Sequence, residues 1–108
     1  MTPASACVVV IVVGLPGAGK SALAAHLEAV FGLRRVCRDR VRAAMFPRCR
    51  YTPTEKRAAL RAVLLAVEVN LALGESTVVD GMTLSRERDR AKLVEVATRM
   101  GALPVFLW

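Results

Sequence analysis

The feature that most constrains the fold is an apolar, β-branched run followed at once by a glycine-rich turn. Residues 7–13 read Cys-Val-Val-Val-Ile-Val-Val, without a polar residue. Such a run is typical of a strand buried on both faces of a parallel sheet. After the turn, apolar residues recur at helical spacing: Ala22, Leu23, Leu27, Val30 and Phe31. This pattern predicts a strand, a loop and a helix in direct succession.

The turn has the spacing G-x-x-x-x-G-K-S, which is that of the phosphate-binding loop of nucleoside triphosphatases and kinases. Its glycines free the backbone to turn its N–H groups toward one anion. Lys20 would add a positive charge for the outer phosphates, and the Ser21 hydroxyl would ligate Mg²⁺. An ordinary glycine-rich turn is the alternative, but the flanking strand and helix favour phosphate binding. We therefore predict ATP and Mg²⁺ as ligands, with nucleotide contacts from Gly14, Pro16, Gly17, Ala18, Gly19, Lys20 and Ser21.

The length of 108 residues allows one domain, which we expect to span residues 1–108. Hydrophobic residues make up 55% of the chain, and this share predicts a packed core. A complete P-loop kinase domain usually has five or more parallel strands. We therefore expect a C-terminally incomplete version of that domain.

The formal net charge is +7, and arginine supplies 13 of the 16 basic residues. Seven arginines lie within residues 34–50, where Asp39 is the only acid. One interpretation is a surface that attracts phosphate or an anionic acceptor, nucleic acid included. The other is generic surface charge exposed to solvent. Composition leaves both interpretations open.

The three cysteines, Cys7, Cys37 and Cys49, lie far apart and form neither a zinc motif nor a disulfide framework. Reduced thiols and a cytoplasmic location are the plain expectation. The apolar run at residues 7–13 is too short for a membrane span and lacks the basic flank of a signal peptide. No membrane partner is therefore predicted.

The rest of the chain alternates between strand and helix patterns, which predicts a three-layer α/β fold with a parallel sheet. The strongest helix start is Thr52-Pro53-Thr54-Glu55, which combines an N-cap, a proline at the first position and a capping box. The lone histidine, His26, is expected to be a partly buried helix residue rather than a catalytic one. The predicted strands are 7–13, 35–38, 76–79 and 103–108, and the predicted helices are 20–30, 39–46, 53–73 and 85–100, the last capped by Ser85.

Two acids follow predicted strands: Asp39 comes after the second and Asp80 after the third. Ligands of open parallel sheets bind at the carboxyl ends of strands, so both carboxylates should face the same crevice as Lys20. One would orient or deprotonate an acceptor hydroxyl, and the other would organise Mg²⁺. The alternative is that either acid caps the following helix. Catalysis is favoured for Asp39, whereas the two roles are evenly balanced for Asp80.

The chain resembles the zeta-toxin and polynucleotide-kinase-like P-loop kinases. The resemblance lies in residues 14–21, in D-x-x-R at Asp39 and Arg42, and in D-G-x-x-L-S-x-x-x-R from Asp80. It implies an adenylate-kinase-like strand order of 2-3-1-4-5. It further implies that Asp39 is the general base, that Arg42 binds the acceptor or the transferring phosphoryl group, and that Asp80 lies near Mg²⁺ or the acceptor.

Three functions remain open: a kinase acting on a hydroxyl, a nucleotide-binding module without turnover, and a P-loop ATPase. The ATPase would need a glutamate after the strand-end acid, where this chain has Gly81. The kinases it resembles continue with a helix, an arginine-bearing lid and a fifth strand. We therefore expect negligible phosphoryl transfer, and an exposed apolar edge from Val105 to Trp108 that favours oligomers.

Overall fold

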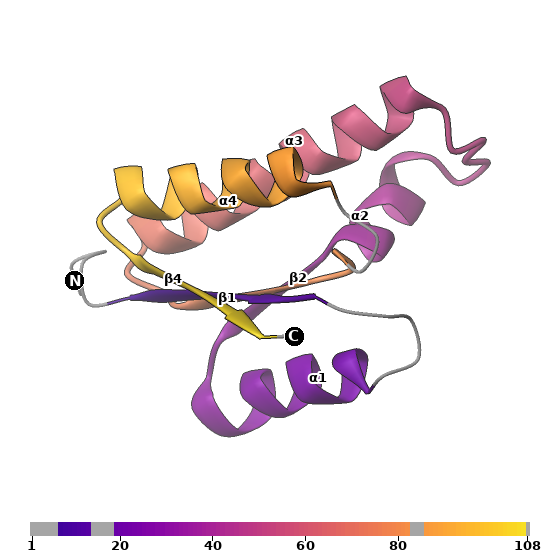
Figure 1. The fold of residues 1–108 in the computed structure, drawn as a ribbon. Helices are drawn as coiled ribbons and strands as arrows, with labels where there is room; N and C mark the ends of the chain where they lie inside the picture. Colours follow the sequence, from indigo (N-terminus) through magenta and orange to yellow (C-terminus); the bar gives the residue numbers. More distant parts are fainter. Residues whose placement is uncertain (1–6, 14–18, 83–85, 108) are drawn as a thin grey trace.

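A computed structural model describes residues 7–13, 19–82 and 86–107 of the chain. Four parallel strands form one sheet in the order β2-β3-β1-β4 (Figure 1). This confirms the predicted α/β class and the predicted order of the first four strands. The strands are β1 (Val8–Val12), β2 (Arg34–Cys37), β3 (Thr77–Asp80) and β4 (Leu103–Leu107).

Strand β1 lies inside the sheet, as its continuous apolar sequence predicted. Its Val10 is in register with Val78 of β3 on one side and with Val105 of β4 on the other. Val9 and Ile11 are fully buried. Apolar side chains on both faces are what two helix layers require, since each face is covered.

Helices cover both faces of the sheet (Figure 1). Helix α1 (Lys20–Phe31) lies against one face, and helices α3 (Pro53–Ala72) and α4 (Glu87–Arg99) lie against the other. The short helix α2 (Arg38–Met45) continues directly from β2. The predicted three-layer arrangement is therefore confirmed.

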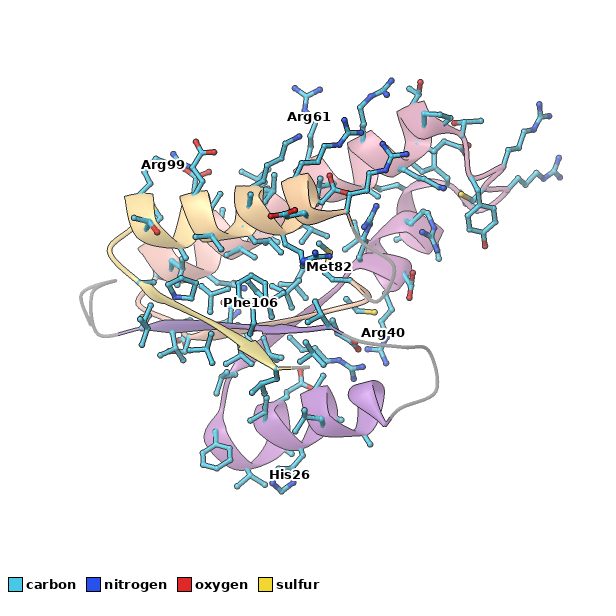
Figure 2. All side chains as sticks on the ribbon, viewed as in Figure 1. His26, Arg40, Arg61, Met82, Arg99 and Phe106 are labelled. Carbon is cyan, nitrogen blue, oxygen red and sulfur yellow. The ribbon has the colours of Figure 1, made fainter. Side chains whose placement is uncertain are left out.

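The two cores are unequal in size. The core beneath α3 and α4 contains fifteen of the described buried residues, whereas the core beneath α1 contains five. On α1, Ala24 is buried, but Val30 and Phe31 are 60% and 66% exposed. His26 is also exposed, and its ring meets that of Phe31 edge-on (Figure 2). The expectation that His26 is partly buried was wrong because its side chain faces away from the sheet.

Helix α3 begins as the sequence predicted. The Thr52 hydroxyl accepts a hydrogen bond from the Glu55 N–H at 3.2 Å, and the Glu55 carboxylate accepts one from the Thr52 N–H at 3.0 Å. This reciprocal pair satisfies two N–H groups that the helix cannot. Pro53 occupies the first helical position.

Two helix starts differ from prediction. Helix α2 begins at Arg38 with Cys37 at the N-cap, so Asp39 lies within the first turn. Helix α4 has Arg86 at its N-cap, and Ser85 lies outside the described residues. In both cases the observed N-cap residue, Cys37 or Arg86, differs from the helix start that the sequence predicted.

Strand β4 lies at the edge of the sheet and pairs with β1 among the described residues. Leu103 is 61% exposed, and the rest of the strand is half-buried. Association through this edge stays a prediction, and Trp108 lies outside the described residues. Within the described part of the chain, no helix has the length and apolar character needed to cross a membrane.

Candidate functional site

The N-terminus of α1 is the first part of the candidate site. Gly19 occupies its N-cap with φ 77°, and no side chain caps the helix. The first turn contains no acidic residue. Uncapped N–H groups and the positive end of the helix dipole suit a phosphate group. Residues 14–18 and the side chains of Lys20 and Ser21 lie outside the described part, so their contacts stay predictions.

Asp80 ends β3 and is 4% exposed. One carboxylate oxygen accepts a hydrogen bond from the Arg35 guanidinium at 2.7 Å, and the other accepts one from the Gly81 N–H at 2.8 Å. Arg35 lies on the neighbouring strand β2, and its side chain is 10% exposed. The hydrogen bond to Asp80 raises the pKa of Arg35 above its usual value.

This ion pair limits what Asp80 can do. Arg35 neutralises the carboxylate, which weakens its attraction for a cation. A carboxylate has about four acceptor positions, and the described residues occupy two of those of Asp80. The remaining positions suit a hydrogen bond from metal-bound water better than direct metal ligation. Asp80 does not cap α4, because that helix begins at Glu87.

Gly81 directly follows β3 and lies against the start of α2. Its φ is 82°, a backbone angle that residues other than glycine rarely adopt. A Cβ added here would lie 3.0 Å from the Arg38 backbone nitrogen and 3.1 Å from that of Asp39. Glycine is therefore needed both for its backbone angle and for close approach. This approach brings the loop after Asp80 against the helix turn that carries Asp39.

Asp39 and Arg42 form the second acid–arginine pair. The Arg42 guanidinium donates to the Asp39 carboxylate at 2.9 Å, and the Asp39 side chain is 62% exposed. No side-chain hydrogen bond caps α2, so the capping alternative for Asp39 was wrong. The guanidinium carbon of Arg42 also lies 4.7 Å from the ring centre of Tyr51, within cation–π range. The predicted D-x-x-R pair is thus brought together, while its catalytic role stays a prediction.

Sequence reasoning missed a pocket beside this pair. A cavity of about 380 Å³ lies between α2 and the loop that follows it. Tyr51 is in the left-handed region with φ 57°, the one non-glycine residue with positive φ in the described part of the chain. The available signal was the chain's single tyrosine, placed directly after the arginine-rich segment. The lining residues are Asp39, Arg42, Ala43, Phe46, Pro47, Arg48, Cys49 and Tyr51.

The seven arginines of residues 34–50 do not form one uniform surface. Arg35 is buried in the pair with Asp80. Arg38 is half-buried, with one guanidinium nitrogen 3.9 Å from the Met82 sulfur. Arg42 is held by Asp39 and Tyr51. Both interpretations stay open for the remaining four, which are exposed: Arg34, Arg40, Arg48 and Arg50.

The described residues contain no group of three or more histidine, cysteine, aspartate or glutamate side chains that could hold a metal ion. The predicted magnesium ligands, Ser21 and Asp80, do not depend on such a group. Magnesium is commonly bound by one or two protein oxygens together with substrate phosphates.

The sheet order and the helix that follows β1 define a P-loop kinase-like fold. Residues 9–108 match a protein family described as an AAA domain, and the chain belongs to that family. A comparison with curated proteins gave no match.

Solved structures of kinases share this fold. The chain superimposes on part of the Pnkp1/Rnl/Hen1 complex with a TM-score of 0.79 and 26% identity, over 94% of this chain and 34% of that one. A candidate kinase from Chloroflexus aurantiacus has a TM-score of 0.75 and 19% identity, over 93% of this chain and 57% of the kinase. The APS kinase CysC of Mycobacterium tuberculosis, solved in complex with AMPPNP and APS, has a TM-score of 0.70 and 20% identity. This match covers 93% of this chain and 60% of the kinase. The chain thus spans between about a third and three fifths of these structures.

Proposed function

We propose that this chain is an ATP-dependent phosphotransferase that acts on a hydroxyl group. The Asp39–Arg42 pair, at the same edge of the sheet as the uncapped N-terminus of α1, carries the proposal. The carboxyl ends of β1, β2 and β3 meet at that edge because the strands are parallel. A phosphate-binding helix end and an exposed acid–base candidate therefore share one region.

Each residue has a proposed role in the transfer. The loop at residues 14–21 holds the ATP phosphates, with Lys20 on the outer ones, and Ser21 and Asp80 serve the Mg²⁺ site. Bound Mg²⁺ would supply charge neutralisation for the phosphates. Asp39 accepts the proton of the acceptor hydroxyl, whose oxygen then attacks the γ-phosphorus as ADP leaves. Arg42 stabilises the negative charge of the acceptor or of the transferring group.

The comparisons support the class of reaction. The Mycobacterium tuberculosis APS kinase was solved with AMPPNP. The 26% identity to the Pnkp1 complex supports the resemblance to polynucleotide-kinase-like kinases, whereas the resemblance to zeta-toxin kinases stays a proposal. We further propose that residues 1–108 form one domain and that the protein is cytoplasmic, because its three described cysteines form no disulfide bond.

A nucleotide-binding module without turnover is the second candidate. The Arg35–Asp80 ion pair favours it, because Arg35 neutralises the carboxylate that would organise Mg²⁺. Transfer of labelled γ-phosphate from ATP separates the two candidates. The acceptors to screen are nucleic acids with a 5′-hydroxyl, nucleotide sugars, antibiotics and small metabolites. Binding of ATP with no transfer to any of these classes would favour the module.

The nucleotide loop has its own test in Lys20→Ala. Loss of a charge at the outer phosphates should weaken ATP–Mg²⁺ binding by about 10-fold or more, as charge-assisted hydrogen bonds of roughly 1.5–3 kcal/mol imply. Isothermal titration calorimetry measures this affinity. Lys92→Ala, which removes the same charge from the exposed side of α4, is the matched control. Equal ATP affinity in the two variants would contradict the phosphate-binding loop.

A further inference from the structure

We propose that the pocket between α2 and the loop at residues 46–51 binds a planar ring that carries an anionic group. This inference rests on the proposed function, since the ligand would be the phosphoryl acceptor and Asp39 lies in the pocket wall. The cavity of about 380 Å³ falls within the range of small-molecule sites. It therefore has room for one ring together with its charged substituent.

The pocket offers flat surfaces for stacking. The guanidinium of Arg42 lies over the ring of Tyr51, 4.7 Å from its centre, and that ring is part of the pocket lining. The Tyr51 residue as a whole is 59% exposed, so its ring remains accessible. Phe46 adds a second aromatic side chain to the lining. Planar rings stack on both aromatic side chains and arginine planes.

The charge of the lining favours an anion. Arg42 is paired with Asp39, so these two charges compensate each other. Arg48 also lines the pocket and forms no ion pair with any residue that the structure describes. Its exposed guanidinium is left to meet a phosphate or carboxylate of the ligand. The lining therefore presents one uncompensated positive charge beside its flat surfaces.

Tyr51 is held in place on both sides. The Glu55 carboxylate accepts hydrogen bonds from the Arg50 N–H at 3.2 Å and from the Thr52 N–H at 3.0 Å. These two residues flank Tyr51, whose φ of 57° is costly for a residue with a side chain. Glu55 thus holds the backbone on either side of Tyr51, and the Arg42 guanidinium lies over the ring. A ring held in advance loses little freedom when a ligand stacks on it.

Calorimetric titration with phenyl phosphate tests the proposal, with glycerol phosphate as an anion of the same charge that lacks a ring. We expect phenyl phosphate to bind at least about 5-fold more tightly, as stacking on an aromatic side chain implies. Uridine monophosphate forms a third arm. A higher affinity for it than for phenyl phosphate identifies a nucleobase as the ring, and the reverse identifies a simple aromatic acceptor. Both rankings support the pocket.

Variants place the binding site. Tyr51→Asn keeps a residue that tolerates positive φ but removes the ring, and it should abolish the preference for phenyl phosphate. Tyr51→Phe should retain the preference, which separates loss of the ring from loss of folding. Arg48→Gln should weaken both anions, whereas Arg61→Gln, on the exposed side of α3, should weaken neither (Figure 2).

Two results would overturn the proposal: equal or unmeasurable binding of the two anions, or loss of phenyl phosphate binding in Lys20→Ala. The second result would place the probe on the nucleotide loop. A separate AMPPNP titration of the unchanged chain tests that loop alone. AMPPNP binding without a ring preference refutes the pocket and keeps the nucleotide site, whereas the opposite result refutes the nucleotide site.

Discussion

Asp80 and Asp39 stand at the same edge of the sheet and pair with arginines at nearly the same distance, 2.7 and 2.9 Å, yet they differ in burial. The Asp80 side chain is 6% exposed and its partner Arg35 is 10% exposed. The Asp39 side chain is 62% exposed. The first pair joins two strands 45 residues apart in the chain, and the second joins residues one helical turn apart. The residue types and the distance between them are therefore nearly the same in the two pairs, and what distinguishes the pairs is burial.

Burial decides what each pair can do. Removing one partner of a buried pair leaves an uncompensated charge, which is strongly destabilising. The Asp39–Arg42 pair contributes less to stability because water screens the exposed Asp39 carboxylate, although the Arg42 side chain is only 18% exposed. The Asp39 carboxylate can thus separate from Arg42 at a smaller cost in free energy than Asp80 can separate from Arg35. We expect substitutions to affect turnover at Asp39 and folding at Asp80.

The largest expected effect is on turnover in Asp39→Asn. A positioned general base contributes about 10²–10⁴-fold, and asparagine cannot accept the proton at neutral pH. Transfer of labelled phosphate should fall by that factor once an acceptor is identified, while ATP affinity and the unfolding midpoint stay nearly unchanged. A protein that unfolds without a specific kinetic defect would show that Asp39 is structural, and would remove the contrast with Asp80.

Arg35→Met should destabilise the fold by about 3–5 kcal/mol, because it leaves the Asp80 charge buried without its partner. Urea denaturation measures the loss. The matched comparison is Arg42→Met, which should cost less than Arg35→Met because the carboxylate that it leaves without a partner, Asp39, is 62% exposed to water. Arg35→Met combined with Asp80→Asn should recover part of the stability. Similar losses in the two single variants would contradict the assigned difference in burial.

Gly81→Ala should cost about 1–3 kcal/mol from its positive φ, with an added cost from contact with the start of α2. Gly32→Ala is the control, since Gly32 has φ 69° and open space around its Cβ position. The difference between the two free energies of unfolding isolates the close approach. Equal losses would show that the loop after Asp80 does not constrain the helix that carries Asp39.

The smallest expected effect concerns pH and Glu55. Hydrogen bonds from the Thr52 N–H and hydroxyl lower the pKa of Glu55 below its usual value of 4.5. Its contribution to stability is therefore present above pH 4.5 and is lost as the pH falls through the lower folded value. Glu55→Gln should lower the melting temperature at pH 7 and have less effect at pH 3. An equal effect at both values would contradict the charge-based role.

Short-range features were predictable from the sequence. The buried strand at residues 7–13, the capping box at Thr52 and Glu55, and the helix end near Gly32 were all confirmed. Each depends on residues within one turn or one strand of each other. Parallel pairing and strand order followed from the alternation of elements and from the resemblance to known kinases.

Long-range contacts were not predictable. Arg35 was counted as one of seven arginines, yet it is the partner of an acid 45 residues away. The amphipathic pattern of α1 predicted a helix, but only the packed sheet decided that Val30 and Phe31 face solvent. The sequence determined the local elements and the chemistry of the loop, because those depend on neighbouring residues. Tertiary structure decided which acid is buried and which stays exposed to solvent, because burial depends on segments that meet only in the folded chain.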